Sequence, residues 1–387
     1  MTNNFPNLNF NRRRRGPLPI VIGILVVASV ALVSLSGFYA DWLWFKSVDF
    51  TEVWSTILLT KAAVFVVGGL ATSLIITLNI YIAFRKRPLY VPQSIEADNL
   101  ERYRSQIEPI RRLVLVGLAL VLFYFGGSSA SQLWDTWLLF RNATPFGVTD
   151  PQFGLDISFF AFKLPMYQAL VGWAISTLVF AIIGSAIVHY LYGGIRPQVA
   201  QERTTVAARV QLSVLLGLVV LLKAGAYWLD RYALALKDNK LITGLTYTDV
   251  NALLPAKAIL TGIALICSLL FFANIVRRSW LLPAAGTALL VVSSVLIAGI
   301  YPAAIQQFQV KPSESSKEAP FIQRNIDATR DAFGLSAVEV KDFQATLNAA
   351  AGNNQDLRTM FAKKSTAQIS AIPVKIAFAG KSALTSV

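Results

Sequence analysis

Long apolar runs, separated by short polar segments, dominate this sequence. A membrane-spanning helix needs about 20 mostly apolar residues, because the hydrocarbon core is about 30 Å thick and a helix rises about 1.5 Å per residue. The pattern therefore predicts an all-α fold, a polytopic transmembrane helix bundle of about seven spans. The runs that satisfy the requirement are 17–38, 54–84, 113–133, 166–192, 206–229, 255–276 and 280–303.

Composition agrees with this prediction and excludes several kinds of site. The chain is 55% hydrophobic and only 14% charged, against about 25% charged residues in soluble domains. It has one cysteine, Cys267, and one histidine, His189. These cannot form a disulfide framework or a metal site built mainly from thiolates or imidazoles. We therefore expect no metal and no cofactor.

The basic residues indicate a topology. The net charge is +14, yet the arginines and lysines stand at the edges of apolar runs and form no continuous face, so we predict no nucleic-acid partner. They are denser in alternate loops, beginning with the four arginines at 12–15. By the positive-inside rule the N-terminus is cytoplasmic, and after seven spans the C-terminus is extracytoplasmic. The predicted parts are a basic N-terminus (1–16), a transmembrane domain (17–303) and an exterior tail (304–387) in the plasma membrane.

The first apolar run has a second interpretation, as a cleaved signal peptide. It follows a basic segment and ends near SGFYA at 36–40. Its apolar stretch is longer than the about 7–15 residues of a signal peptide, and further spans follow. We interpret it as an uncleaved anchor.

Aromatic residues gather just after this run, in DWLWFKSVDFTEVW at 41–54. The predicted topology puts them in the first outer loop. Tryptophan prefers the membrane–water interface, where its ring is apolar and its N–H stays hydrated. We predict an aromatic belt, which a short interfacial helix would also provide; a ligand-binding aromatic box is the alternative.

Three loops carry charged groups that could act chemically. Segment 85–112 mixes acids and arginines at helical spacing, which favours a solvated helix with ion pairs; docking to anionic lipid is the alternative. On the outer side, the candidate acids for chemistry on lipid are Asp150, Asp156, Asp230 and Asp249. Helix capping and turn formation are the competing explanation for Asp150 and Asp156.

Two lysines lie inside predicted spans, and buried charge in a membrane usually has a function. Lys61 and Lys223 are therefore candidates for a transport path, with snorkelling or an ion pair to an outer acid as the alternative. No predicted span contains a carboxylate near its middle, which weakens a proton-coupled transporter. The small residues GGSSAS at 126–131 and GSA at 184–186 predict close helix packing. The sequence shows no catalytic motif of a known hydrolase, nucleotide-binding enzyme or metalloprotease.

Four separated motifs carry a resemblance to a known family: DWLWF, RYRSQIEPIRR, DPQFGLDISFFAFKLP and APFIQRNIDATRDAFGL. Over about residues 15–340 the chain resembles the large actinobacterial membrane proteins of uncharacterised protein family 0182. The resemblance implies seven N-terminal spans followed by a large extracytoplasmic domain that begins near Ala319. Because family members are much longer, we expect the tail beyond about residue 340 to be truncated or frameshifted. The family has no assigned activity, so no catalytic residue is carried over.

These observations favour an integral plasma-membrane protein that anchors or assembles an extracytoplasmic envelope domain. Its expected partners are the lipid bilayer, together with envelope proteins or further copies of the same chain. The alternative is a transporter or channel that uses the bundle. A membrane-embedded enzyme acting on lipid is a third hypothesis, with the four outer acids as its only candidate groups.

Overall fold

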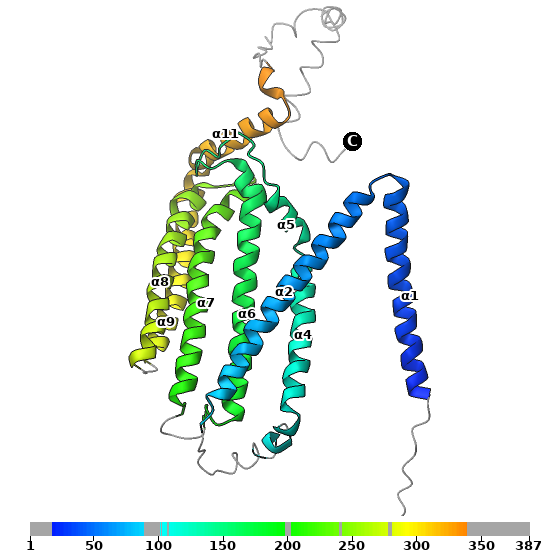
Figure 1. Ribbon diagram of the computed structural model, residues 1–387. Helices are drawn as coiled ribbons and strands as arrows, with labels where there is room; N and C mark the ends of the chain where they lie inside the picture. Colours follow the sequence, from blue (N-terminus) through cyan, green and yellow to red (C-terminus); the bar gives the residue numbers. More distant parts are fainter. Residues whose placement is uncertain are drawn as a thin grey trace, which may run out of the picture. The chain divides into compact units, whose positions relative to one another are not determined.

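The computed structural model describes residues 18–88, 101, 103–106, 108–197, 203–239, 242–277 and 281–338, and the described part is helical without a β-strand. The α-helices are α1 (Leu18–Ser47), α2 (Thr51–Arg85), α4 (Arg111–Ser131), α5 (Trp134–Arg141), α6 (Leu164–Leu191), α7 (Val206–Ala233), α8 (Leu254–Arg277), α9 (Leu281–Val295), α10 (Tyr301–Ile305) and α11 (Glu314–Ala332) (Figure 1). Short 3₁₀ or π turns are η1 (Glu108–Ile110), η2 (Phe159–Lys163), η3 (Leu234–Leu236), η4 (Asp249–Leu253), η5 (Leu296–Ile300), η6 (Gln306–Val310), η7 (Lys311–Ser313) and η8 (Leu335–Ala337).

The described helices confirm the predicted class. Seven helical stretches are long and apolar enough to cross a membrane: Val21–Ser47, Thr51–Arg85, Tyr103–Ser131, Phe159–Leu191, Val206–Leu236, Asp249–Arg277 and Leu281–Ala332. Each overlaps one of the seven predicted runs. The predicted cytoplasmic segment 1–16, residues 89–100 of the solvated helix expected within 85–112, and the tail beyond 338 lie outside the described residues.

The first span is longer than the sequence pattern predicts, and this corrects the position of the aromatic stretch. Helix α1 continues through Ser47, so DWLWFK forms its last turns and is not a loop. No glycine or proline interrupts the chain from Phe38 to Ser47, which lets the helix continue. It ends where Asp49 adopts φ 61°, a left-handed conformation that aspartate tolerates better than most residues. Phe38 then packs on Trp54 of α2, with ring centroids 4.9 Å apart.

The bundle is assembled by neighbouring helices in sequence order. Helix α2 packs against α4 and α6, α6 against α7, and α7 against α8, which also contacts α9. A buried cluster between α7 and α8 consists of Val220, Ala224, Tyr227, Leu260, Ala264, Cys267 and Phe271. The described side chains of α1 are all at least partly exposed, as expected for a helix whose apolar surface faces lipid.

Glycines make the α2–α4 contact close. A Cβ on Gly68 would lie 2.2 Å from the Cβ of Ala130, and one on Gly127 would lie 2.7 Å from the backbone oxygen of Phe65. Any side chain there would push the helices apart. The predicted role of GGSSAS as a packing surface is confirmed, and GG at 68–69 of α2 is its partner. This is the small-residue packing typical of membrane helices.

The last span continues into a polar helix without a break. Residues from Leu281 to Ala332 form one helical run, in which η5, α10, η6 and η7 join apolar α9 to α11. Pro302 and Pro312 lie inside this run, directly after the π turns η5 and η6, and such local π turns let a membrane helix accommodate a proline, which has no N–H to donate. Residues up to Asn325 belong to one compact unit, and Ile326 begins a second. In the second unit, α11 ends before Gly334, whose φ is 64°.

Candidate functional site

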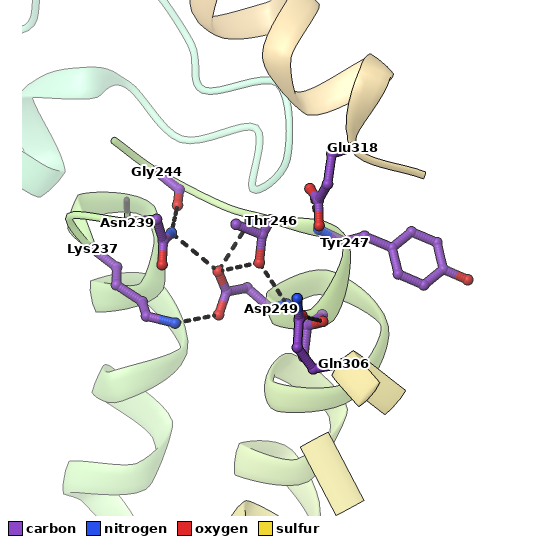
Figure 2. A network of polar contacts seen from close by, with 9 residues as sticks. Lys237, Asn239, Gly244, Thr246, Tyr247, Asp249, Gln306 and Glu318 are labelled. Atoms are coloured by element: carbon purple, nitrogen blue, oxygen red, sulfur yellow. Dashed lines mark hydrogen bonds and ion pairs between the residues drawn. The ribbon is translucent and has the colours of Figure 1, made fainter. Parts of the chain in front are cut away.

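Asp249 forms the centre of a polar network in the segment that joins α7 to α8 (Figure 2). Its side chain is fully buried. The Nζ of Lys237 lies 2.9 Å from Oδ1, while the backbone N–H and the hydroxyl of Thr246 donate to Oδ2 at 3.0 and 2.7 Å. The Nδ2 of Asn239 donates to the carbonyl of Gly244 at 2.7 Å and lies 3.5 Å from Oδ2. A buried carboxylate needs such donors because an unpaired charge in the interior is costly.

The local sequence explains why this network forms. In TYTD at 246–249, the Thr246 hydroxyl accepts the Asp249 N–H at 3.3 Å, and the Asp249 carboxylate accepts the Thr246 N–H. This reciprocal arrangement is a capping box, with aspartate at the position where glutamate is usual. It begins the helical run Asp249–Arg277. The turn before it requires Gly244, whose φ of 115° few other residues adopt.

Helix α11 and η6 are attached to the same segment. Both carboxylate oxygens of Glu318 accept the Tyr247 N–H, at 3.0 and 3.2 Å, and the Glu318 side chain is buried. The Nζ of Lys317 donates to the Tyr247 hydroxyl at 3.3 Å. The hydroxyl of Thr248 donates to Gln306 of η6. Figure 2 shows Glu318 of α11 beside Tyr247, and Asp249 at the centre of the contacts within the segment itself.

A cavity of about 570 Å³ lies beside this network. Its polar lining includes Lys237, Thr248, Asp249, Glu314 and Glu318, and Leu253 and Ile322 contribute apolar surface. Because Asp249 is already surrounded by donors and the Thr248 hydroxyl is bound to Gln306, these groups are positioned to hold structure. The arrangement suits binding or docking better than acid–base chemistry. Within the described residues, His, Cys, Asp and Glu form no group of three suited to a metal ion.

The other three predicted outer acids lie in different surroundings. Asp230 of α7 pairs with Lys257 of α8, with 2.8 Å between Oδ2 and Nζ. Asp150 accepts the N–H groups of Gln152 and Phe153 at 2.9 and 2.7 Å. Each acid therefore has its own partners, and the described contacts do not bring the four together.

Asp156 stabilises the turn that contains Gly147. It accepts the backbone N–H groups of Phe146, Gly147 and Ser158 at 3.1, 2.9 and 2.8 Å. The Ser158 hydroxyl and these N–H groups favour the ionised form, and they lower the pKa of Asp156 from 3.8 to about 2. Asp150 and Asp156 thus form turns, which was the competing explanation in the sequence analysis.

Both predicted intramembrane lysines rest on aromatic rings. The Nζ of Lys61 lies 5.0 Å from the ring centroid of Trp134, and that of Lys223 lies 4.8 Å from the centroid of Tyr227. A cation over a ring face is attracted by the ring quadrupole. Tyr227 is also 5.4 Å from the Nζ of Lys257. The structure brings Lys223 near the Asp230–Lys257 pair through this ring and places Lys61 in a separate contact.

The comparisons with known proteins give the chain's family. A family model described as Uncharacterised protein family (UPF0182) matches residues 18–371. The chain belongs to this family. UPF0182 proteins from Streptomyces coelicolor, Nocardioides sp. and Thermobifida fusca are 47%, 47% and 45% identical to it over 336, 348 and 340 residues. These alignments cover 86%, 90% and 88% of this chain but 34%, 35% and 33% of the relatives, so the chain spans about a third of their length. No solved structure matches the chain.

Sequence reasoning found Asp249 of this UPF0182 chain but missed its partners. Lys237 and Asn239 were not singled out, nor were Gln306 and Glu318, which bind the neighbouring Thr248 and Tyr247. The TYTD capping box before an apolar run was the signal available in the sequence, and it would have indicated a structural role for Asp249. No local pattern connects Glu318 to Tyr247, 71 positions away.

Proposed function

We propose that this chain is the membrane module of a plasma-membrane protein that anchors an extracytoplasmic envelope domain and fixes its position. The attachment of α11 carries the proposal. An anchor that only tethers a domain needs no more than a flexible linker. Here the polar helix continues from the last apolar span and is also bound to the α7–α8 segment through Glu318 and Tyr247. Two attachments restrict rotation of α11 about the span.

The relatives support a larger assembly. The chain aligns with only about a third of each UPF0182 relative, so those proteins contain further sequence that such a module could hold. The proposed partners are other envelope proteins or further copies of the chain. The cavity beside α11 offers them a recessed surface with both charged and apolar residues.

The proposal requires α11 and the 142–158 segment to lie outside the cell, with the N-terminus in the cytoplasm. Arg324 of α11 lies 3.4 Å from Gln152, so both belong to the same end of the bundle. Thr144 and Arg112 are exposed; Arg112 lies in the first turn of α4, whereas Thr144 follows α5, beyond the other end of α4. In intact cells, a membrane-impermeant maleimide should label Thr144→Cys and spare Arg112→Cys. The native Cys267 is buried. The reverse labelling would overturn the proposed orientation.

The positioning role is tested by removing the Glu318 contact. Spin labels at Leu236→Cys and Ala319→Cys report the distance between the end of α7 and α11 in the full chain, reconstituted in lipid nanodiscs. Glu318→Ala leaves the Tyr247 N–H without its acceptor, and the distance distribution should broaden. Glu314→Ala is the matched control, because this exposed acid lies one turn earlier on α11. An unchanged distribution in Glu318→Ala would show that this contact does not position α11.

A deletion strain connects this measurement with function. A gene carrying Glu318→Ala should complement less well than the wild-type gene, at equal protein level in the membrane. If Glu318→Ala broadened the distance distribution but complemented fully, a fixed position of α11 would not be needed for function. That result would overturn the proposed positioning role.

A further inference from the structure

A second charged cluster lies at the opposite end of the bundle. Helices α6 and α7 are antiparallel neighbours, so Tyr192, just after α6, lies at the other end from the segment that follows α7. The rings of Phe84 and Tyr192 meet there with centroids 5.1 Å apart. The guanidinium carbons of Arg87 and Arg111 lie 4.3 and 4.4 Å from the Phe84 centroid. Both arginines therefore lie against one aromatic ring at the point where α2 ends and α4 begins.

One carboxylate holds the two arginines together. The Nη1 atoms of Arg111 and Arg87 lie 2.8 and 3.5 Å from the same Oε1 of Glu108. The Tyr192 hydroxyl donates to Oε2 at 3.4 Å. Burial and the Glu108 carboxylate raise the pKa of Tyr192, so its hydroxyl keeps the proton it donates near neutral pH. Two positive groups and one negative group leave an excess of positive charge.

The two guanidinium groups retain donors for a ligand. Each has five N–H donors, and the described contacts use one from each on Glu108. The side chains of Arg87 and Arg111 are 38% and 35% exposed, so an incoming group can reach them. Arg104 differs, because its Nε donates to the carbonyl of Leu191 at 2.5 Å and closes the end of α6.

The position of the cluster indicates the ligand. Arg87 follows the end of one candidate span, Arg111 lies near the start of the apolar part of another, and Tyr192 follows a third. Charged groups at span ends lie at the level of the lipid headgroups. Contact with the Phe84 ring holds both guanidinium groups in place before any ligand arrives, which reduces the entropy lost on binding.

We propose that Arg87 and Arg111 together bind the phosphate of an anionic phospholipid headgroup, with Glu108 and Phe84 as positioning residues. Guanidinium and phosphate form paired, charge-assisted hydrogen bonds. Because both arginines converge on one Glu108 oxygen, a single phosphate can bridge their outward edges. The exposed Arg112, next to Arg111 on α4, adds charge near the surface but has no place in this arrangement.

Native mass spectrometry of the full-length protein tests the assignment. The protein is released from nanodiscs that contain phosphatidylcholine with a minor fraction of phosphatidylglycerol, and the retained lipids are counted. The wild type should retain phosphatidylglycerol in preference to phosphatidylcholine. Arg87→Gln or Arg111→Gln should lower this retention about tenfold, as expected from losing one charge-assisted contact. Equal retention of the two lipids by the wild type would overturn the proposal.

Two further variants separate a built site from general attraction. Arg112→Gln removes the same charge one residue away and should leave retention within about twofold of wild type, because exposed charges are screened. Phe84→Leu removes the stacking surface without changing charge and should weaken retention. If Arg112→Gln lost as much lipid as Arg111→Gln, the effect would be surface charge alone, and the site would be refuted.

A competition experiment distinguishes the source of the phosphate. Adding inorganic phosphate at millimolar concentration should leave phosphatidylglycerol bound, because the lipid is also held by its acyl chains. Displacement of the lipid at that concentration would show a site for a soluble phosphate compound and overturn the lipid assignment. Thermal melting of each variant in phosphatidylcholine alone confirms that it is folded before retention is compared.

Discussion

The two ends of the bundle use charge in opposite ways. At the α11 end, Asp249 is fully buried and Glu318 nearly so, and both are held by N–H groups of the α7–α8 segment. At the Tyr192 end, Arg87 and Arg111 lie on an aromatic ring and keep more than a third of their surface exposed. Burial commits a charged group to its partners, whereas half-exposure leaves donors for a ligand.

The chemistry of the side chains accounts for this difference. A carboxylate has no donor of its own when ionised, so a buried one is stable only where the backbone or a lysine supplies donors. A guanidinium is planar and can lie against a ring while its edges stay hydrated. The α11 end therefore suits a fixed junction, and the Tyr192 end suits reversible binding.

The largest expected effect comes from removing the buried carboxylate. Asp249→Ala should lower the free energy of unfolding by about 3 kcal/mol, because several buried hydrogen bonds and the capping box are lost together. This value is at the lower end of the free-energy range for breaking a buried ion pair, because the Lys237 ammonium group can move into the solvent. Asp238→Ala, an exposed acid in the same loop, should cost no more than about 0.5 kcal/mol. Unfolding in detergent micelles measures both, and similar losses would contradict the contrast between buried and exposed acids.

A smaller effect should follow from the capping residue alone. Thr246→Val removes the hydroxyl that accepts the Asp249 N–H and should cost about 1 kcal/mol. Thr246→Ser keeps that hydroxyl and should lie close to wild type. Equal unfolding midpoints for the two variants would mean that the capping box does not stabilise this end.

At the Tyr192 end, stability should change much less. Arg111→Gln should lower the free energy of unfolding by less than about 1 kcal/mol, and the loss should shrink at high salt, because the ion pair with Glu108 is partly exposed. The same detergent assay measures this change. A loss as large as that of Asp249→Ala would mean that the arginine cluster is needed for folding. It would contradict the stated difference between the two ends of the bundle.

The smallest effect is confined to acid pH and to one turn. The folded pKa of Asp156 is about 2 against an ordinary value of 3.8, so its contribution is complete above about pH 4 and is lost as the pH falls through about 2. Pepsin should therefore cut near residues 142–158 more readily at pH 2 than at pH 4. In Asp156→Asn this pH dependence should be weaker. Equal pH dependence in both proteins would exclude Asp156 as its cause.

Particular elements show how far sequence reasoning reached. The seven spans could be predicted because a single requirement, length in hydrocarbon, decides them. The end of α1 was placed nine residues too early, at 38 against Ser47. An amphipathic aromatic stretch is compatible with a helix and with a loop, so the sequence pattern does not show where the helix ends. The GGSSAS motif predicted a close contact, but only the fold identified GG at 68–69 as its partner.

The candidate sites divide in the same way. Lys61, Lys223 and the four acids could be selected because each is a charged group in or beside an apolar run. What each one touches could not be predicted: Trp134 lies 73 positions from Lys61 along the chain, and α11 approaches the α7–α8 segment from another part of the sequence. Such pairings depend on which helices pack together.

By itself, then, the sequence determined that this protein is a seven-span helical membrane protein. Whether a segment can span a membrane depends on its own length and hydrophobicity, so each span can be recognised without knowing its neighbours in the fold. Only the tertiary structure decided which charges are buried and which remain available, because this depends on donors and rings brought from distant segments. Asp249 and Arg111 are both charged residues beside apolar runs. Asp249 lies at the centre of a buried polar network, whereas the guanidinium group of Arg111 remains partly exposed.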